Sequence, residues 1–254
     1  MNISIQDFFK PIHLDAAPSA EDYRHIQSYV RLADAFSQLT YQTIYFIDYY
    51  KRGFHYVSEN PLFLCGKTAK QVLAAGYQFY MENVPEKDLQ LLLEINDAGN
   101  KFFSKLPIAE KLDYSISYDF RLKQPNGHLI LINHKLTPLA LDKDGKIWIA
   151  LCVVSLASHD KPGSIVMVKN SAQKKALEYR LTTKKWTERK DVKLNGQEKE
   201  ILILSVQGFT VKEIADRLFL SADTIKFHKK NIFKKLNATN ISAAIFAAVN
   251  YGII

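Results

Sequence analysis

One stretch of the sequence combines dense positive charge with helical spacing. Residues 221–236, SADTIKFHKKNIFKKL, contain five lysines and no acidic residue after Asp223. At about 100° per residue, Ile225, Ile232 and Leu236 fall within one stripe of a helix. A cationic ridge lies roughly opposite and consists of Lys226, Lys230 and Lys234. Because ordinary solvated helices interleave acids for i, i+4 pairing, this pattern indicates a helix with one packing face and one face suited to a polyanion.

The helix must be positioned by its neighbours, and the flanking sequence is rich in helix boundaries. Capping residues followed three positions later by glutamate predict two helix starts, and a glycine predicts one helix end. The predicted caps are Asn195 with Glu198, Thr210 with Glu213, Ser221, and Asn240 or Thr239, and Gly208 closes the first helix. Residues 193–254 are therefore expected to form four short helices packed in a small bundle.

The two central helices of this bundle have helix-turn-helix spacing. TVKEIADRL predicts a helix of about nine residues, FLS a three-residue turn, and the lysine-rich helix follows. Ala215 is small where two crossing helices approach each other. Ile214, Leu218 and Leu220 are apolar where the two helices would share a core. In such a motif the second helix enters the DNA major groove.

The segments EKEIL, GFTVKEIADRL, LSADTIKFHKKNIFKKL and AAIFAAVNYGII closely resemble the DNA-binding domain of the LuxR family. That resemblance implies two sets of contacts with DNA. The base-facing positions would be Lys226, Phe227 and Lys230. The backbone and phosphate positions would be Thr224, Lys234 and Lys235 on the lysine helix, and Thr210, Val211 and Lys212 at the start of the preceding helix.

Some positions depart from the family pattern. LNGQE replaces the usual Leu-Thr-basic opening, and Ile241 stands where the family usually has arginine. Losing that arginine removes a surface contact, so the last helix is expected to pack or dimerise differently. His228 matches the family's histidine but falls on the packing stripe, so we interpret it as a core or phosphate-side residue and not as a catalyst.

The first 160 residues have a different pattern. Ser19 with Asp22 predicts the start of a helix whose apolar stripe is Tyr23, Ile26, Val30, Ala33 and Phe36. QTIYFIDYYKRGFHYVSEN predicts a hairpin, residues 61–100 are mostly helical with breaks near Gly76 and Pro85, and YSISYDFRL, HLILINHKLTPLAL and KIWIALCVVSLAS predict three strands. This order predicts an antiparallel sheet with helices on one face.

Residues 20–158 resemble a PAS domain in element order and in the segments IYFIDY, HYVSEN, CGKT and NVPEKDL. The resemblance implies a sensory or dimerising module with a small internal pocket. The candidate pocket residues are Phe46, Tyr56, Phe63, Phe79, Tyr80 and Leu112. Because they are aromatic or apolar, they fit either an apolar small-molecule ligand or a filled core, and the sequence leaves both interpretations open.

Charge is distributed unevenly along the chain. Residues 1–160 carry 16 Lys and Arg against 18 Asp and Glu, residues 161–192 carry 9 against 3, and residues 193–254 carry 9 against 5. Only the second part of the chain is therefore suited to a polyanion.

We predict a PAS-like domain at 1–160, a basic strand-containing connector at 161–192 and a LuxR-type domain at 193–254. The connector is either a basic linker or, as we prefer, a small hairpin that extends the sheet and is anchored by Trp186.

Motifs for catalysis and for cofactor binding are missing from the sequence. It contains no P-loop, GxGxxG, HExxH or GxSxG segment. Cys65 lacks the Asn-Cys-Arg-Phe run of a flavin photosensor, and nothing supports His55 or His134 as a haem ligand. Cys65 and Cys152 do not have the spacing of metal ligands or of a disulfide. The first part of the chain also lacks the alternating strands and helices, with an acidic cluster, that are typical of a phosphoacceptor receiver domain. We expect no enzyme activity, no metal and no resident cofactor.

The predicted fold class is α+β: a PAS-like antiparallel sheet with helices, followed by an all-α four-helix helix-turn-helix domain. The predicted function is a cytoplasmic, homodimeric regulator that binds double-stranded DNA, since one recognition helix reads too few bases to specify a site. The alternative is a sensory module whose helical tail contacts a protein such as RNA polymerase. No signal peptide is expected, and the longest apolar run, residues 147–156, is too short to span a membrane.

Overall fold

The computed structural model describes residues 3–10, 12, 14, 17–40, 42–170, 175–189, 192–250 and 252–254. The chain divides into two compact units, Met1–Arg189 and Lys190–Ile254. In the first unit the helices are η1 Ile5–Phe8, α1 Ala20–Thr40, α2 Pro61–Leu64, α3 Ala69–Ala75, α4 Gln78–Asn83, α5 Glu86–Phe103 and η2 Ile108–Asp113. The strands are β1 Thr43–Asp48, β2 Gly53–Val57, β3 Tyr114–Lys123, β4 Leu129–Leu141, β5 Ile147–Leu156, β6 Gly163–Lys169, β7 Lys175–Arg180 and β8 Lys185–Glu188.

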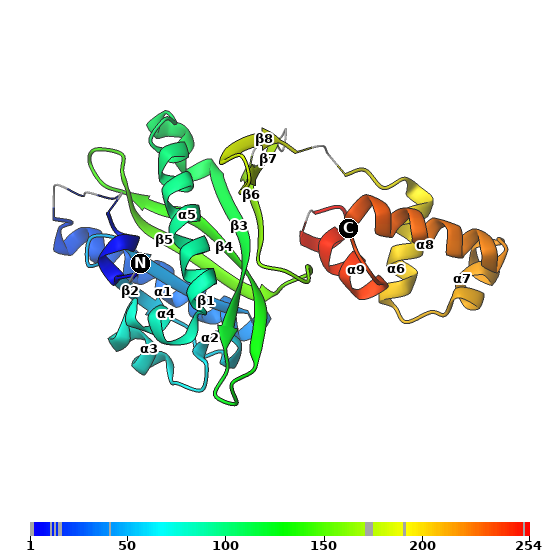
Figure 1. The fold of residues 1–254 in the computed structure, drawn as a ribbon, viewed down its shortest axis with the longest axis horizontal. Coiled ribbons are helices and arrows are strands. Elements are labelled where there is room, and N and C mark those ends of the chain that lie inside the picture. Colours follow the sequence, from blue (N-terminus) through cyan, green and yellow to red (C-terminus); the bar gives the residue numbers. More distant parts are fainter. Residues whose placement is uncertain are drawn as a thin grey trace. The chain divides into compact units, whose positions relative to one another are not determined.

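The strands of the first unit form one sheet in the order β2-β1-β5-β4-β3-β6-β7-β8, with every neighbouring pair antiparallel (Figure 1). The predicted hairpin is β1–β2, and the three predicted strands are β3, β4 and β5. The breaks within 61–100 lie where expected, since Gly76 ends α3 and Pro85 precedes α5. The predicted α+β order of hairpin, helices and three strands is confirmed.

The segment after residue 160 continues the same sheet. Strands β6, β7 and β8 follow one another outward from β3, so the sheet reaches Glu188 and the first unit includes most of the segment predicted as a connector. The Trp186 ring packs against Phe102 and Tyr179, with ring centroids 5.6 and 5.1 Å apart. Part of the turn expected at 169–175 lies outside the described residues.

Helices cover the two faces of the sheet unequally. Apolar side chains of η1 and α2–α5 form the main core against one face, and α5 runs across it (Figure 1). A smaller core on the other face joins Ile26 and Ala33 of α1 to Phe46 and Trp148. Helices were expected on one face only, so α1 corrects that prediction. Phe36, predicted on the buried stripe of α1, is 53% exposed.

A buried polar cluster lies within the main core. The Tyr45 hydroxyl bonds with both the Tyr80 hydroxyl and Nε2 of His134. Nδ1 of His134 is buried and has no hydrogen-bond partner among the described residues. Burial lowers the pKa of His134 from 6.5 to about 3, so the imidazole is neutral in the folded protein.

This histidine should make the first unit sensitive to acid. Below pH 6.5 the unfolded chain binds a proton that folded His134 rejects, so its contribution to stability falls by about 1.4 kcal/mol per pH unit until pH approaches 3. Denaturant unfolding followed by tryptophan fluorescence measures this, because Trp148 and Trp186 both lie in the first unit. His134→Leu should flatten the pH slope and His128→Leu, at an exposed position, should keep it. Equal slopes in both variants would contradict the assignment.

The second unit consists of four helices: α6 Gly196–Val206, α7 Val211–Leu218, α8 Ala222–Leu236 and α9 Ile241–Asn250. Asn195 and Thr210 form complete capping boxes with Glu198 and Glu213. Asn240 caps α9 by accepting from the Ala243 amide at 2.9 Å. Gly208, at φ +89°, ends α6 in a left-handed conformation that glycine adopts at little cost. The predicted four-helix unit is confirmed, and its fully buried residues include Ile201, Leu202, Ile214, Ile225, Ile232, Ala244 and Ala248.

Candidate nucleic-acid interface

The start and end of α8 are set by its own sequence. The Ser221 hydroxyl accepts a hydrogen bond from the Thr224 amide at 3.1 Å. Asp223 adds a negative charge to the first turn, where the helix dipole is positive, and Lys234 and Lys235 occupy the last turn. Asn237 ends the helix in the left-handed conformation, φ 52°.

The two faces of α8 separate as the sequence predicts. Ile225 and Ile232 are fully buried, and Leu236 is 2% exposed. Lys226, Lys230 and Lys234 are exposed. Phe227, 62% exposed, lies beside them. Lys226 bonds with Asp223 at 3.0 Å, but both side chains are exposed, and such pairs contribute little to stability. The exposed face of α8 is therefore cationic and carries one aromatic ring.

Helix α7 holds α8 through a tight turn. Ile214 is fully buried and Ala215 is 4% exposed, where α7 and α8 pack. Phe219 ends α7 at φ +56°, and the Leu220 amide donates to the Ala215 carbonyl at 2.9 Å. The Phe219 side chain is 95% exposed, a feature that the sequence reasoning did not single out. This geometry is a helix-turn-helix.

The residues expected to contact phosphate do not share one environment. Thr210 and Lys212 are exposed, and Val211 and Thr224 are half-buried. The Thr210 amide and hydroxyl bond with the Glu213 carboxylate at 2.7 and 2.8 Å. These bonds, first the backbone and then the side chain, lower the pKa of Glu213. A carboxylate thus already lies at the start of α7, where the phosphate contact was expected.

Lys235, predicted to contact the DNA backbone, forms an ion pair within the second unit. Its Nζ lies 2.7 Å from Oε2 of Glu198, whose side chain is only 3% exposed. The same Glu198 oxygen accepts from the Asn195 amide at 2.8 Å. The pair therefore joins the end of α8 to the start of α6, inside the unit. Because the Lys235 ammonium is engaged by a buried carboxylate, we expect its main role to be this ion pair; the phosphate contact predicted for it stays a prediction.

His228 is half-buried, and its Nδ1 is buried without a partner in the part of the chain that the structure describes. Lys229, next to it, is also half-buried, and burial lowers its pKa. Both residues lie between the packing and cationic faces of α8. The placement agrees with a packing role for His228, and nothing beside it suggests catalysis.

The six candidate pocket residues of the first unit are not brought together around a cavity. Phe63 and Phe79 are fully buried in the main core, with Tyr80 at 5% exposure. Phe46 and Tyr56 pack on the opposite face of the sheet, and Leu112 is 50% exposed. Of the two interpretations that the sequence leaves open, the filled core agrees with the positions of the three central aromatic residues, and the sheet separates them from Phe46 and Tyr56.

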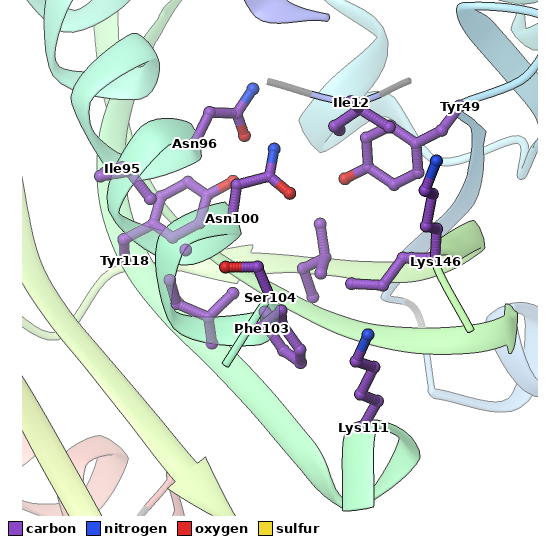
Figure 2. Close-up of a pocket in the computed structure, with 14 residues that line it drawn as sticks. Ile12, Tyr49, Ile95, Asn96, Asn100, Phe103, Ser104, Lys111, Tyr118 and Lys146 are labelled. Carbon is purple, nitrogen blue, oxygen red and sulfur yellow. The ribbon is translucent and has the colours of Figure 1, made fainter. Parts of the chain in front are cut away.

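A cavity of about 270 Å³ lies elsewhere in the first unit, between α5 and strands β3–β5. Asn96 and Asn100 of α5 face Tyr49 and Lys146 across it, and Lys111 extends into it from η2 (Figure 2). The sequence reasoning missed this site, since its polar residues come from four separate segments. Among the described residues, no group of three His, Cys, Asp or Glu side chains could hold a metal ion.

The capped helix-turn-helix, with a second helix that is cationic on its exposed side, places the second unit in the class of helix-turn-helix domains. Residues 193–248 match the family model "GerE: Bacterial regulatory proteins, luxR family". Over these residues the second unit is similar to the LuxR family.

The curated relatives match only a short part of this chain. The regulatory protein SdiA of Escherichia coli is 39% identical over 64 residues, which are 25% of this chain and 27% of SdiA. The oxygen regulatory protein NreC of Staphylococcus carnosus is 48% identical over 44 residues, 17% of this chain and 20% of NreC. The chain thus spans about a quarter of the length of the curated relatives it matches.

The matching solved structures cover between about a quarter and nine-tenths of this chain. The structure of the transcription factor GerE is 32% identical in sequence, with a TM-score of 0.23. The match covers 25% of this chain and 92% of the GerE chain. Vibrio cholerae VqmA is 18% identical and covers 87% of both chains, with a TM-score of 0.32. Within the described residues, no helix combines the length and apolar character that a bilayer crossing demands.

Proposed function

We propose that this chain is a DNA-binding transcriptional regulator in which α8 reads the major groove. The observation that carries the proposal is the one-sided cationic face of α8 within a capped helix-turn-helix. Lys226, Phe227 and Lys230 form the base-reading set, because lysine ammonium groups can donate to guanine O6 and N7. Lys212 and Lys234, with Thr210, Val211 and Thr224, form the phosphate-contacting set.

The PAS-like unit supplies the input in this proposal. It is an independent unit with its own core and a cavity that could admit a small molecule. Two copies of the chain are needed for a specific site, since one recognition helix contacts only a few base pairs. The boundaries we propose are 193–254 for DNA binding and the preceding residues for sensing and pairing.

The test is binding of the intact chain to duplex DNA at a series of stated salt concentrations. Specific retardation of a subset of genomic fragments supports the proposal, and loss of affinity with rising salt reports phosphate contacts. A chain that binds no fragment selectively would contradict it. The alternative, a tail that contacts a protein partner, predicts saturable partner binding that survives high salt. No contact in the described residues favours RNA polymerase as that partner.

The salt dependence of DNA binding distinguishes lysines that contact phosphate from lysines that do not. Lys212→Ala and Lys234→Ala should each reduce the slope of log K against log salt by about 0.9, because each removes one phosphate contact. The matched control Lys143→Ala changes an exposed lysine of the first unit and should leave the slope unaltered. Fluorescence anisotropy with a labelled duplex measures all three. An unchanged slope in the Lys212 and Lys234 variants would remove both residues from the phosphate set.

A further inference from the structure

The cavity of the first unit has mostly apolar walls and a small volume. Ile95 and Phe103 of α5 line one side, and Ile116, Leu136 and Ile147 of the sheet line the other. Its volume of about 270 Å³ lies near the lower end of the roughly 300–1,000 Å³ of ligand pockets. The walls therefore suit a small molecule with an apolar body.

Within the described part of the chain, one buried charge in this cavity has no counter-charge. Lys111 is 9% exposed, and its Nζ donates to the Gly145 carbonyl at 2.7 Å. Among the described residues no carboxylate lies within ion-pair distance of this ammonium, nor does any Asp or Glu line the cavity. Burying an ammonium without an opposite charge is costly, and the Gly145 carbonyl satisfies only one of its three N–H donors.

Further polar groups converge on the same space. Asn96 and Asn100 point into the cavity from α5, opposite Tyr49 and the half-buried Lys146 (Figure 2). The Asn96 amide also donates to the Phe8 carbonyl at 3.2 Å. Burial raises the pKa of Tyr49, so its hydroxyl stays protonated and can donate a hydrogen bond. These groups offer donors to an oxygen-bearing ligand head, beside the cation.

We propose that this cavity binds a small carboxylate with an apolar body, its negative charge neutralised by Lys111. The inference rests on the proposed function, in which the first unit receives a signal. One buried ammonium matches one negative charge, and a neutral or cationic ligand would leave the cost of burying Lys111 uncompensated. The carboxylate provides the missing counter-charge, and the aliphatic and aromatic walls cover the body of the ligand.

A matched series of ligands tests the charge. The probes are 3-phenylpropionate, 3-phenylpropanamide and 3-phenylpropylamine, which share one body and differ in the head group. Calorimetry on the intact chain should give an affinity for the acid at least about tenfold above that for the amide, and no binding of the amine. Equal affinities for acid and amide, or no binding of the acid at millimolar concentration, would overturn the proposal.

Three variants locate the effect. Lys111→Met should reduce acid affinity about tenfold or more while leaving amide affinity unchanged, and Lys111→Arg should restore the preference for the acid. Gly99→Leu should block both ligands, because a side chain at Gly99 projects toward Ile116, the nearest atom being 4.0 Å from the added Cβ. Tryptophan fluorescence checks that each variant is folded. A folded Lys111→Met variant that still binds the acid more tightly than the amide would contradict the proposal.

DNA binding is measured in parallel on the same preparations. If the chain retards DNA selectively but does not bind 3-phenylpropionate, the ligand proposal fails and the proposed function stands. If it binds the acid through Lys111 but no DNA, the regulator proposal fails and the pocket assignment stands.

Discussion

Replacing Lys226 and Lys230 together by alanine should abolish discrimination between a specific duplex and a scrambled one. Each good lysine–guanine contact contributes about 1–3 kcal/mol to that discrimination, so the specificity ratio should fall by one to several orders of magnitude. Both side chains are exposed, and their loss should change the stability of the second unit by no more than about 0.5 kcal/mol. Competition binding with the two duplexes at one salt concentration measures the ratio.

The matched control for this experiment is Lys212→Ala, at the start of α7. It should weaken binding to both duplexes by a similar factor, because phosphate contacts carry no sequence information. The double variant at Lys226 and Lys230 should instead weaken the specific complex more than the scrambled one. An unchanged specificity ratio in the double variant would mean that α8 does not read bases.

Replacing Lys235 by methionine should strongly destabilise the second unit. The substitution leaves the Glu198 carboxylate 3% exposed, with the Asn195 amide as its remaining hydrogen-bond donor among the described residues. Breaking a buried pair on one side costs about 3–5 kcal/mol, and the 40% exposure of Lys235 favours the lower end of that range. A four-helix unit of about 60 residues has little stability beyond this.

Lys234→Met is the matched control, one residue earlier and exposed, with no ion pair among the described contacts. It should leave stability within about 0.5 kcal/mol while lowering affinity for DNA. Far-ultraviolet circular dichroism follows the helices of both units, and tryptophan fluorescence reports the first unit separately, so a transition seen only by circular dichroism belongs to the second unit. Glu198→Gln combined with Lys235→Met should recover much of the stability, because glutamine still accepts from Asn195 without a buried charge. A stable Lys235→Met protein with weakened DNA binding would return Lys235 to the phosphate set.

Local sequence signals predicted most of the second unit. Caps such as Ser221 and Thr210 act within three residues, and the stripe of Ile225, Ile232 and Leu236 depends only on helical periodicity. These are short-range causes, so the sequence shows where each helix begins and which face of α8 is exposed. For the same reason, the hairpin and the three strands of the first unit were predictable from alternation and turn residues.

The sequence by itself thus determined the elements, their order and the cationic face of α8. The tertiary structure decided the rest, because long-range contacts leave no periodic signal. Lys235 resembles Lys234 in sequence, but its partner Glu198 is 37 residues away. Phe46 of β1 and Phe63 of α2 are both buried aromatic residues, yet they pack on opposite faces of the sheet. Because all six residues of β1 are buried, no alternation in its sequence indicates which face Phe46 occupies. The cavity around Lys111 exists only where α5, η2 and the sheet meet.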